Sequence, residues 1–268
     1  MLFLGQLMKK LFVPICFVAI ILSIYSLRSN SDQIQTTQLP SNSNCSNLVV
    51  EGKFPILRGK TSQTLLCRSR YVTEYSTERK TPIWVYQKLE RSVFSENEKR
   101  VNAFARDPDI DDIQEASLKD YEGSGFDRGH MASAANMGDD NKAMLESFYL
   151  TNMIPQNSNN NRGIWKALEY KEREVAGSFG PIYVIDGPVY AAGFKKIGTN
   201  NVAVPQQLFK ILIRPDNHTM ISFIIPNDKI QRYQLPRYIT TLDNIQKQTG
   251  IIFFPDVSEK FTESKTMW

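Results

Sequence analysis

Cysteine and histidine are scarce in this chain of 268 residues, which holds three of the first and two of the second. No cysteine stands in a CxxC pair or at the cysteine–histidine spacing of a zinc site, so zinc bound through thiolates is not expected. The Gly-x-Ser-x-Gly, His-Glu-x-x-His and P-loop patterns are absent as well. The sequence therefore lacks the signatures of α/β-hydrolases, zinc metalloproteases and P-loop nucleoside triphosphatases.

A strong bias of charge is also missing. The net charge is +4, but Lys9, Lys10 and Arg28 fall in the first thirty residues without an acid, which leaves the remainder at +1. The contents of 41% hydrophobic and 22% charged residues are ordinary for a globular protein. No repeat of fixed period is visible. Total charge thus says little about partners, and any basic groove must come from local clustering.

The first residues have the pattern of an export signal. Lys9-Lys10 precede a mostly apolar run from Leu11 to Leu27, and a basic stretch followed by an apolar one is typical of such signals. The run is longer than a signal-peptide core of roughly 7–15 residues and shorter than a membrane span of roughly 20. We expect residues 1–28 to be a cleaved signal peptide or an uncleaved signal anchor. The protein would then be periplasmic, secreted or anchored to the membrane by this segment.

The remaining cysteines bear on the same question. Cys16 lies in the apolar leader, which leaves Cys45 and Cys67 as an even pair. In an exported protein a disulfide between them is expected, and it would stabilise the fold by about 3 kcal/mol. Two unpaired thiols are the alternative. Residues 29–44 are polar and lack aromatic residues, so they are predicted to be a flexible linker.

Residues 45–268 have the composition of a globular domain. Strand-like runs arrive in pairs around turns, and helical segments lie between them in no strict βαβ rhythm, which indicates an α+β fold with a mainly antiparallel sheet. The predicted hairpins are 69–75 with 81–86 and 208–214 with 219–225, a single strand is 181–186, ended by Gly187-Pro188, and the helices are 140–147, 162–175 and 240–248, the last stopped by Gly250.

His130 is the first candidate for catalysis. A lone histidine is more often structural, and His218 lies in a turn-like segment, but Asp127-Arg128-Gly129 precede His130. Arg128 can neutralise a phosphate, Gly129 permits close approach of the backbone, and Asp127 can order the turn or a neighbouring backbone group. Imidazole titrates near neutrality, so it can take a proton from water.

A predicted helix about thirty residues later carries a second polar set. At about 100° per residue, Asn161, Trp165 and Glu169 fall within about 80° of one another, and Arg162 and Arg173 lie at the margin of that sector. An amide, a carboxylate and two guanidinium groups can therefore face one groove. The alternative is an ordinary surface helix in which Glu169 and Arg173 form an i,i+4 ion pair, and periodicity alone favours it.

The two regions together resemble a known family. Asp127-Arg128-Gly129-His130, Thr151-Asn152-Met153-Ile154-Pro155-Gln156 and Asn161-x3-Trp165-x2-Leu168-Glu169 are similar to the motifs of the DNA/RNA non-specific endonucleases. These are ββα-metal (His-Me finger) enzymes related to mitochondrial endonuclease G and to secreted bacterial sugar-non-specific nucleases. The resemblance covers roughly residues 45–256. It implies a ββα-metal finger nuclease, with a mainly antiparallel central sheet flanked by helices, as the domain 45–268.

The resemblance also implies roles for single residues. His130 would be the general base that activates the attacking water, and Asn161 the one protein side chain bound to Mg²⁺, with Mn²⁺ as the other metal to consider. Glu169 would hold water bound to the metal, and Asn152 would help to orient the site.

Arginines complete the implied site. Arg128 and Arg173 would contact phosphate oxygens, and the family uses a further arginine upstream, for which Arg100 and Arg106 are the candidates.

The implied substrates are DNA and RNA, because water is the nucleophile and the contacts go to phosphates rather than to bases. The membrane enters only through the N-terminal segment, and the sequence leaves open whether the chain forms a homodimer. The alternative function is a non-catalytic nucleic-acid-binding module of the cell envelope, for example in DNA uptake. Such a module would keep Arg128, Arg162 and Arg173 but would not need His130 or Asn161.

Overall fold

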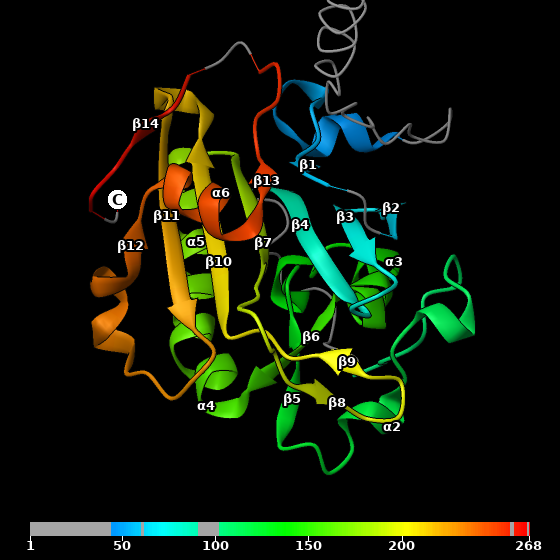
Figure 1. Cartoon of the computed structure of the whole chain (residues 1–268). Coiled ribbons are helices and arrows are strands. Elements are labelled where there is room, and N and C mark those ends of the chain that lie inside the picture. The colour runs from blue at the N-terminus through cyan, green and yellow to red at the C-terminus, as the bar shows by residue number, and fades with distance from the viewer. Residues whose placement is uncertain (1–43, 60–61, 91–101, 258–259, 267) are drawn as a thin grey trace, which may run out of the picture. The chain divides into compact units, whose positions relative to one another are not determined.

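The computed structural model describes residues 44–59, 62–90, 102–257, 260–266 and 268 (Figure 1). The predicted leader, residues 29–43 of the predicted linker and Arg100 lie outside these residues. Within the described ranges, no helix has both the length and the apolar character required to cross a bilayer.

An eight-stranded sheet forms the centre of the fold (Figure 1). Neighbouring strands are antiparallel along its main path, and only β14 (Thr262–Glu263) pairs in parallel, with β11. The predicted α+β class with a mainly antiparallel sheet is confirmed. The path runs β12 (Ile239–Thr240), β11 (Thr219–Pro226), β10 (Gln207–Arg214), β7 (Ile182–Val189), β4 (Thr81–Leu89), β3 (Tyr71–Ser76) and β2 (Gln63–Cys67).

Both predicted hairpins are present. The strands β3 and β4 pair across the turn at 77–80, and β10 and β11 pair across η9 (Pro215–Asn217) and His218. These strands are rich in β-branched and aromatic residues, which suit a pleated and buried surface. His218 adopts a left-handed conformation with φ of 54° and lies exposed in the turn, as expected for a histidine outside the site.

The predicted end of the third strand is wrong. β7 continues through Gly187-Pro188 to Val189, although both residues usually interrupt strands. A Cβ on Gly187 would lie 2.5 Å from the ring of Phe209, so the glycine makes room for that ring. Beyond Asp186 the strand is paired only with β10, and a proline without an N–H is tolerated where a strand is paired on one side.

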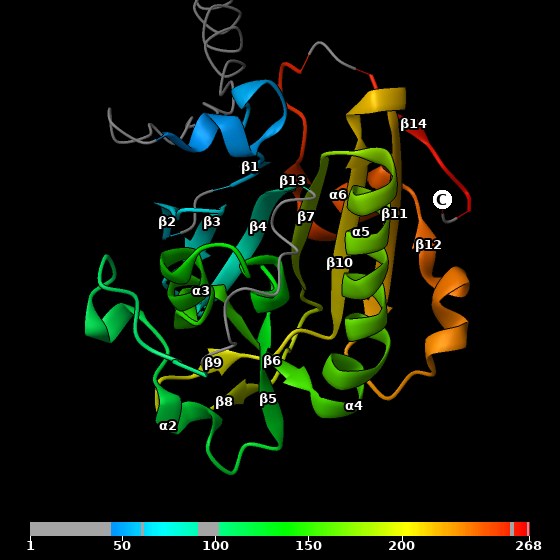
Figure 2. The same cartoon turned by 180° about the vertical axis from the view of Figure 1, so that it is seen from behind.

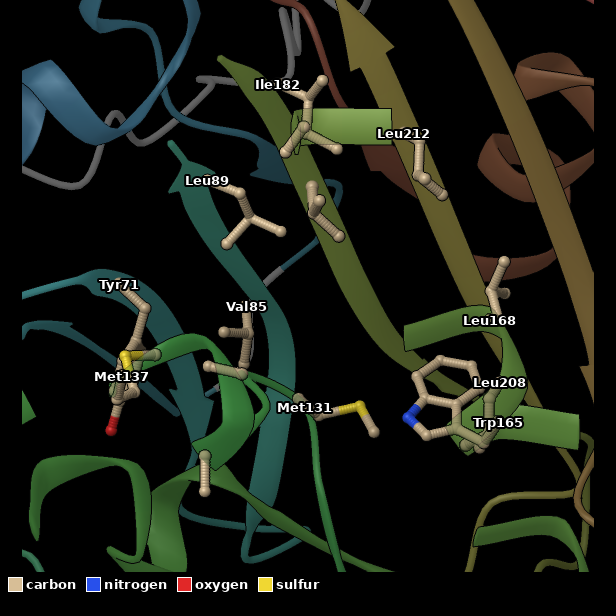
Figure 3. Close-up of a cluster of buried hydrophobic side chains, with 14 of the residues drawn as sticks. Tyr71, Val85, Leu89, Met131, Met137, Trp165, Leu168, Ile182, Leu208 and Leu212 are labelled. Carbon is tan, nitrogen blue, oxygen red and sulfur yellow. The ribbon is translucent and has the colours of Figure 1, made fainter. Parts of the chain in front are cut away.

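Side chains alternate across the sheet, so its two faces have different partners. α5 (Lys166–Phe179) packs on one face, which we call the α5 face (Figure 2). α6 (Leu242–Thr249) packs on the other, the α6 face, together with η2 (Asn44–Leu48) (Figure 1). Buried apolar clusters fill both layers, and Figure 3 shows part of the cluster on the α5 face, with Trp165 and Leu168 near Leu208 and Leu212.

Two local predictions on the α6 side are confirmed. The side chain of Thr241 accepts a hydrogen bond from the N–H of Asn244 at the start of α6, and Gly250 ends the helix with φ of 74°, a conformation that favours glycine. The predicted disulfide joins Cys45 of η2 to Cys67 of β2, with their Cα atoms 5.9 Å apart.

The candidate motifs lie on a compact ββα unit. β5 (Phe126–His130) pairs antiparallel with β6 (Met153–Asn157), and the chain then enters α4 (Ser158–Asn160), η8 (Asn161–Trp165) and α5 without a break. The side chain of Asn157 caps this helix by accepting hydrogen bonds from the N–H groups of Asn159 and Asn160. The helix thus begins four residues before the predicted 162 and ends at Phe179 rather than 175.

Short elements connect these parts. The predicted helix 140–147 is confirmed as α3 (Asn141–Ser147), and β13 (Ile251–Ile252) pairs with β1 (Ile56–Leu57). The others are η3 (Val50–Gly52), η5 (Asp112–Gln114), α2 (Leu118–Tyr121), η6 (Ala134–Asn136), η7 (Leu150–Asn152), β8 (Lys196–Ile197), β9 (Val202–Ala203) and η10 (Arg232–Tyr238).

Candidate active site

The segment from Asp127 to Asn136 runs alongside the helix that follows β6. Three side-chain contacts join the two, and each involves a residue that the sequence singles out. We call this line of contacts the β5–α5 seam: Asp127 with Asn161, Ser133 with Glu169, and Asn136 with Arg173. His130 lies between the first two contacts along its segment. The seam therefore joins the segment that carries His130 to the helix that carries Asn161, Glu169 and Arg173.

Asp127 fixes the amide of Asn161. The Nδ2 of Asn161 donates to Oδ2 of Asp127 over 3.0 Å, and because an ionised carboxylate only accepts hydrogen bonds, the amide oxygen must point away from it. Arg162 donates to the same carboxylate from Nε at 2.9 Å and from Nη2 at 2.8 Å. Asp127 thus binds two side chains rather than a neighbouring backbone group. An amide oxygen is a type of ligand that hard cations take, and that of Asn161 is not engaged by Asp127.

The backbone of the helix changes its pitch at this point. η8 is a π-helical turn, and Gly163 inside it has φ of −105° and ψ of −106°. The angular count made from the sequence assumed an unbroken α-helix, so it does not describe the residues before Trp165. π-helical turns are frequent at functional sites. Asn161 and Arg162 lie within this turn, while Glu169 and Arg173 follow on the regular helix.

His130 is held against aromatic rings at the end of β5. Its ring centroid lies 4.8 Å from that of Phe148, edge to face, and 5.6 Å from that of Phe104. Such contacts restrict the orientation of an imidazole. Only 9% of the residue is exposed. His130 is therefore positioned by packing, with a small part of its surface open to solvent.

Gly129 permits a close approach, but its neighbour is a protein side chain. A Cβ at this position would lie 2.0 Å from Oε1 of Gln156, so any larger residue would displace that side chain. Gln156 is buried and donates to Asn160, which in turn donates to the carbonyl of Pro226. Gly129 therefore lets β5 and β6 pack closely. The hydrogen bonds of Gln156 and Asn160 link the ββα unit to β11.

Asn152 acts on the segment that follows His130. Its Oδ1 accepts from the N–H of Ala132 at 2.9 Å, and its Nδ2 donates to the carbonyls of Ala132 and Ser147 at 2.9 and 2.8 Å. The residue is fully buried. These three bonds all go to the backbone, so the structure places Asn152 as a clamp on the chain beside His130.

Glu169 is partly buried, and its protonation changes near neutral pH. Burial, with a further contribution from the negative charge of Glu172, raises the pKa of Glu169 to about 7. Lys210, Arg173 and a hydrogen bond from Ser133 act in the opposite direction. A carboxyl with such a pKa gains or loses its proton readily in neutral solution.

A buried ion cluster, which the sequence reasoning missed, lies beneath the seam. Nζ of Lys210 is 2.6 Å from Oε2 of Glu172 and 2.8 Å from Oδ1 of Asp186, and all three side chains are fully buried. Burial raises the pKa of Asp186 to about 8, against the opposing effect of Lys210. The cluster holds two carboxyls and one ammonium, and the negative charge of Glu172 adds to the effect of burial on the pKa of Asp186. Lys210 and Asp186 are charged residues within otherwise mostly apolar strands. This sequence feature could have revealed the buried ion cluster.

Asn136 was missed as well, and no local pattern marks it. It is buried, and its Nδ2 donates to Glu172 at 2.9 Å and to Gln87 at 3.2 Å, while its Oδ1 accepts from Nη1 of Arg173 at 3.1 Å. Asn136 therefore links Arg173 to the buried ion cluster and to β4. The residue comes from a segment distant in sequence from the helix, so only the fold reveals the contact.

The other arginines differ in their surroundings. The guanidinium of Arg128 lies 4.3 Å from the ring centroid of Phe104 and is partly exposed. Arg106 is paired with Asp112 at 2.8 Å and with Glu115 at 3.4 Å, so its charge is largely matched. Arg100 lies outside the described residues. Of the predicted phosphate-binding residues, Arg128 and Arg173 belong to the segment and helix that form the seam.

The oxygen ligands available at the seam suit a hard cation such as Mg²⁺ better than a softer metal. The described residues contain no group of three or more His, Cys, Asp or Glu side chains that could hold a metal. Mg²⁺ does not need such a group, because it keeps several waters and takes oxygen ligands. The oriented amide oxygen of Asn161, with the carboxyl of Glu169 farther along the helix, is an oxygen set of this kind.

Comparisons with known proteins agree with this geometry. A model of the DNA/RNA non-specific endonuclease family matches residues 55–260. The chain is 31% identical over 207 residues to the mitochondrial nuclease EXOG of Homo sapiens, covering 70% of this chain and 56% of that protein. It is 32% identical over 208 residues to mitochondrial endonuclease G of Homo sapiens, covering 72% and 70%. With nuclease C1 of Cunninghamella echinulata var. echinulata it shares 32% over 211 residues, covering 72% and 84%.

The fold is likewise similar to a solved structure. A chain in the crystal structure of the EndoG/EndoGI complex superposes with a TM-score of 0.74 at 27% sequence identity, covering 85% of this chain and 98% of that one. This agrees with the predicted ββα-metal architecture. The chain spans little more than half the length of human EXOG, at 56%. With a family model matched over most of its length, this chain belongs to the DNA/RNA non-specific endonuclease family.

Proposed function

We propose that this protein is an exported endonuclease that hydrolyses the phosphodiester bonds of DNA and RNA with one divalent metal ion. The observation that carries the proposal is the β5–α5 seam, where His130 lies between the Asp127–Asn161 and Ser133–Glu169 contacts. Relatives named as nucleases support the same chemistry.

In this proposal His130 is the general base. It takes a proton from the attacking water, and its packing against Phe104 and Phe148 keeps the imidazole oriented for that transfer. Arg128 and Arg173 donate to phosphate oxygens as negative charge develops there. The hydrogen bond from Arg173 to Asn136 holds its guanidinium in place before the substrate arrives.

Asn161 would hold the metal ion, Mg²⁺ in the first instance and Mn²⁺ as the alternative, with Glu169 in the outer sphere. The ion, when bound, supplies Lewis-acid stabilisation of the phosphorane-like transition state and of the leaving 3′ oxygen. Asp127 binds the Asn161 amide nitrogen and so fixes the orientation of the amide before a metal ion is bound. The pKa of Glu169, about 7 without metal, would fall beside a bound cation, so that its charged form would be favoured there.

Substrate breadth and location follow from further features. Because water is the nucleophile, no ribose 2′-OH is needed, and contacts to phosphates carry no base preference. Lys9-Lys10 with the apolar run to Leu27 support export, and so does the Cys45–Cys67 disulfide, because such bonds persist in oxidising compartments. The protein would act in the periplasm, outside the cell, or at the membrane that the leader anchors it to.

The test uses the purified protein with a circular plasmid and with RNA, in the presence of Mg²⁺ or of a chelator. Both substrates should be cut, and the chelator should stop the reaction. His130→Ala should lower the rate by about two to four orders of magnitude. His218→Asn, which changes the other histidine in an exposed turn, should cut at the wild-type rate.

A second variant addresses the metal. Asn161→Ala should lose Mg²⁺-dependent cleavage while its circular dichroism spectrum matches the wild type. Cleavage by His130→Ala at nearly the wild-type rate would rule out its role as the base. Binding of nucleic acid without any cleavage would favour the envelope-binding function instead.

A further inference from the structure

A groove of uniform charge lies beside the candidate site. One side is formed by Ser158, Asn159, Arg162 and Gly163, and the other by residues 229–233. Three of its lining residues are cationic, namely Arg162, Lys229 and Arg232, and none of the lining residues is an acid. A concave surface with one sign of charge concentrates ligands of the opposite sign.

The groove is continuous with the β5–α5 seam. Arg162 follows Asn161 directly, and its guanidinium pairs with the Asp127 carboxylate that also holds the Asn161 amide. Arg232 reaches across from the other wall and donates from Nη2 to the carbonyl of Arg162 at 3.2 Å. Figures 1 and 2 both show the segment that follows β11 passing α4 on its way to η10. The groove thus begins one residue from the proposed metal ligand.

Tyr233 adds an aromatic surface to the groove. The residue is 78% exposed, although large apolar rings usually find a partner within the fold. Lys229 and Arg232 make no ion pair with a carboxylate within the described ranges, while Arg162 is matched by Asp127. Exposed aromatic rings next to unpaired cations are the features with which proteins bind single-stranded nucleic acids, because unpaired bases stack on the rings and phosphates meet the cations.

We propose that this groove binds the single-stranded nucleotides that flank the scissile phosphate. One unpaired base stacks on Tyr233, and backbone phosphates pair with Lys229 and Arg232. A duplex keeps its bases stacked inside, so it cannot offer one to Tyr233 without opening. The inference rests on the proposed function for the position of the scissile bond, and DNA and RNA share the chemistry that the groove recognises.

The experiment measures binding rather than cleavage. The full-length protein is titrated with fluorescent dT12 and rU12 and with a hairpin duplex, in chelator, so that no hydrolysis occurs. Tyr233→Ala should weaken binding of both single strands by about 5- to 150-fold, the range for loss of one stacked base, and should change duplex binding far less. Tyr233→Phe keeps the ring and should bind like the wild type.

Two matched controls test position. Tyr170 is also an exposed tyrosine, at 60%, but it does not line the groove, so Tyr170→Ala should leave binding unchanged. Lys229→Ala and Arg232→Ala should each lower the slope of log K against log salt by about 0.7 for a single strand. Lys247→Ala, on α6 at the opposite face of the sheet, should not.

The outcomes separate this inference from the proposed function. Equal binding by Tyr233→Ala and the wild type would overturn the groove assignment, even in a protein that cuts plasmid normally. Equal losses with Tyr170→Ala, or equal losses for duplex and single strand, would overturn it too. A ring-dependent preference for single strands in a protein that cuts nothing would support the groove and contradict the nuclease. A difference between dT12 and rU12 would assign the preferred sugar.

Discussion

The two faces of the central sheet are built from different chemistry. On the α5 face, Gln87, Asp186 and Lys210 come from three neighbouring strands and are fully buried. They meet Glu172 and Asn136 directly below the β5–α5 seam. The α6 face carries mostly apolar side chains, among them Ile185, Phe209 and Ile211, which pack with Ile245 of α6.

The buried polar groups on the α5 face and the apolar side chains on the α6 face contribute differently to stability and to the geometry of the site. Buried ions contribute little net stability, because removal of charges from water offsets their attraction. Apolar packing on the α6 face contributes stability in proportion to buried area. The α5 face instead holds Asn136, and through it Arg173, in one arrangement. We infer that the apolar clusters on both faces support the fold, and that the polar network on the α5 face in addition fixes the geometry of the site.

The largest effect should come from breaking the buried ion cluster. Lys210→Met removes the ammonium and leaves Glu172 and Asp186 facing each other in a buried place. Removal of one partner from a buried ion pair costs about 3–5 kcal/mol, which urea unfolding can measure. Its neighbour Ile211 points to the α6 face, and Ile211→Val there should cost about 0.5–1.5 kcal/mol. Equal losses in the two variants would contradict the distinction between the faces.

Removal of the Cys45–Cys67 disulfide tests whether a change on the α6 face lowers stability without affecting the site. Cys45 packs in the cluster on the α6 face, so Cys45→Ser with Cys67→Ser should lower stability without disturbing the seam. The expected loss is about 3 kcal/mol, from the loop of 22 residues that the bond closes. Denaturant unfolding measures this loss. The rate of phosphodiester cleavage, measured where the variant is still folded, should equal that of the wild type. A lower rate in folded protein would show that the α6 side also positions the site.

Local signals were sufficient to predict most of the α6 side. The two hairpins follow from runs of β-branched and aromatic residues around turns, and the end of α6 follows from Gly250, although α6 begins at Leu242 rather than at the predicted 240. Each of these elements is determined by residues close together in sequence. The disulfide also followed from counting, because only two cysteines lie outside the leader.

The α5 side could be predicted only in part. Motif residues such as His130 and Asn161 were identified from the sequence, and the seam brings their segments together. The π-helical turn at Gly163 could not be counted from a regular period, because it inserts an irregular step into the helix. Asn136 depends on contacts with Gln87 and Glu172 from distant elements. Such contacts exist only after the chain has folded.

The smallest of the three effects concerns pH and the α5 face. In the absence of metal, the pKa of Glu169 is raised from its ordinary 4.5 to about 7. Between these values the folded protein holds a proton that the unfolded chain has lost, so stability should fall as pH rises through this window. One group contributes at most about 1.4 kcal/mol per pH unit. Urea unfolding in chelator from pH 5 to 8 measures the slope.

Glu169→Gln should flatten that slope, because the amide does not titrate. Glu174→Gln is the matched control, since Glu174 is exposed on the same helix beside Lys171 and remains in water in both states. Asp186, with its pKa raised to about 8, should leave part of the slope in every variant, because it too binds a proton more tightly in the folded state. Identical slopes for the wild type and Glu169→Gln would mean that Glu169 is ionised throughout, and the pH sensitivity of the α5 face would then reside in the buried ion cluster alone.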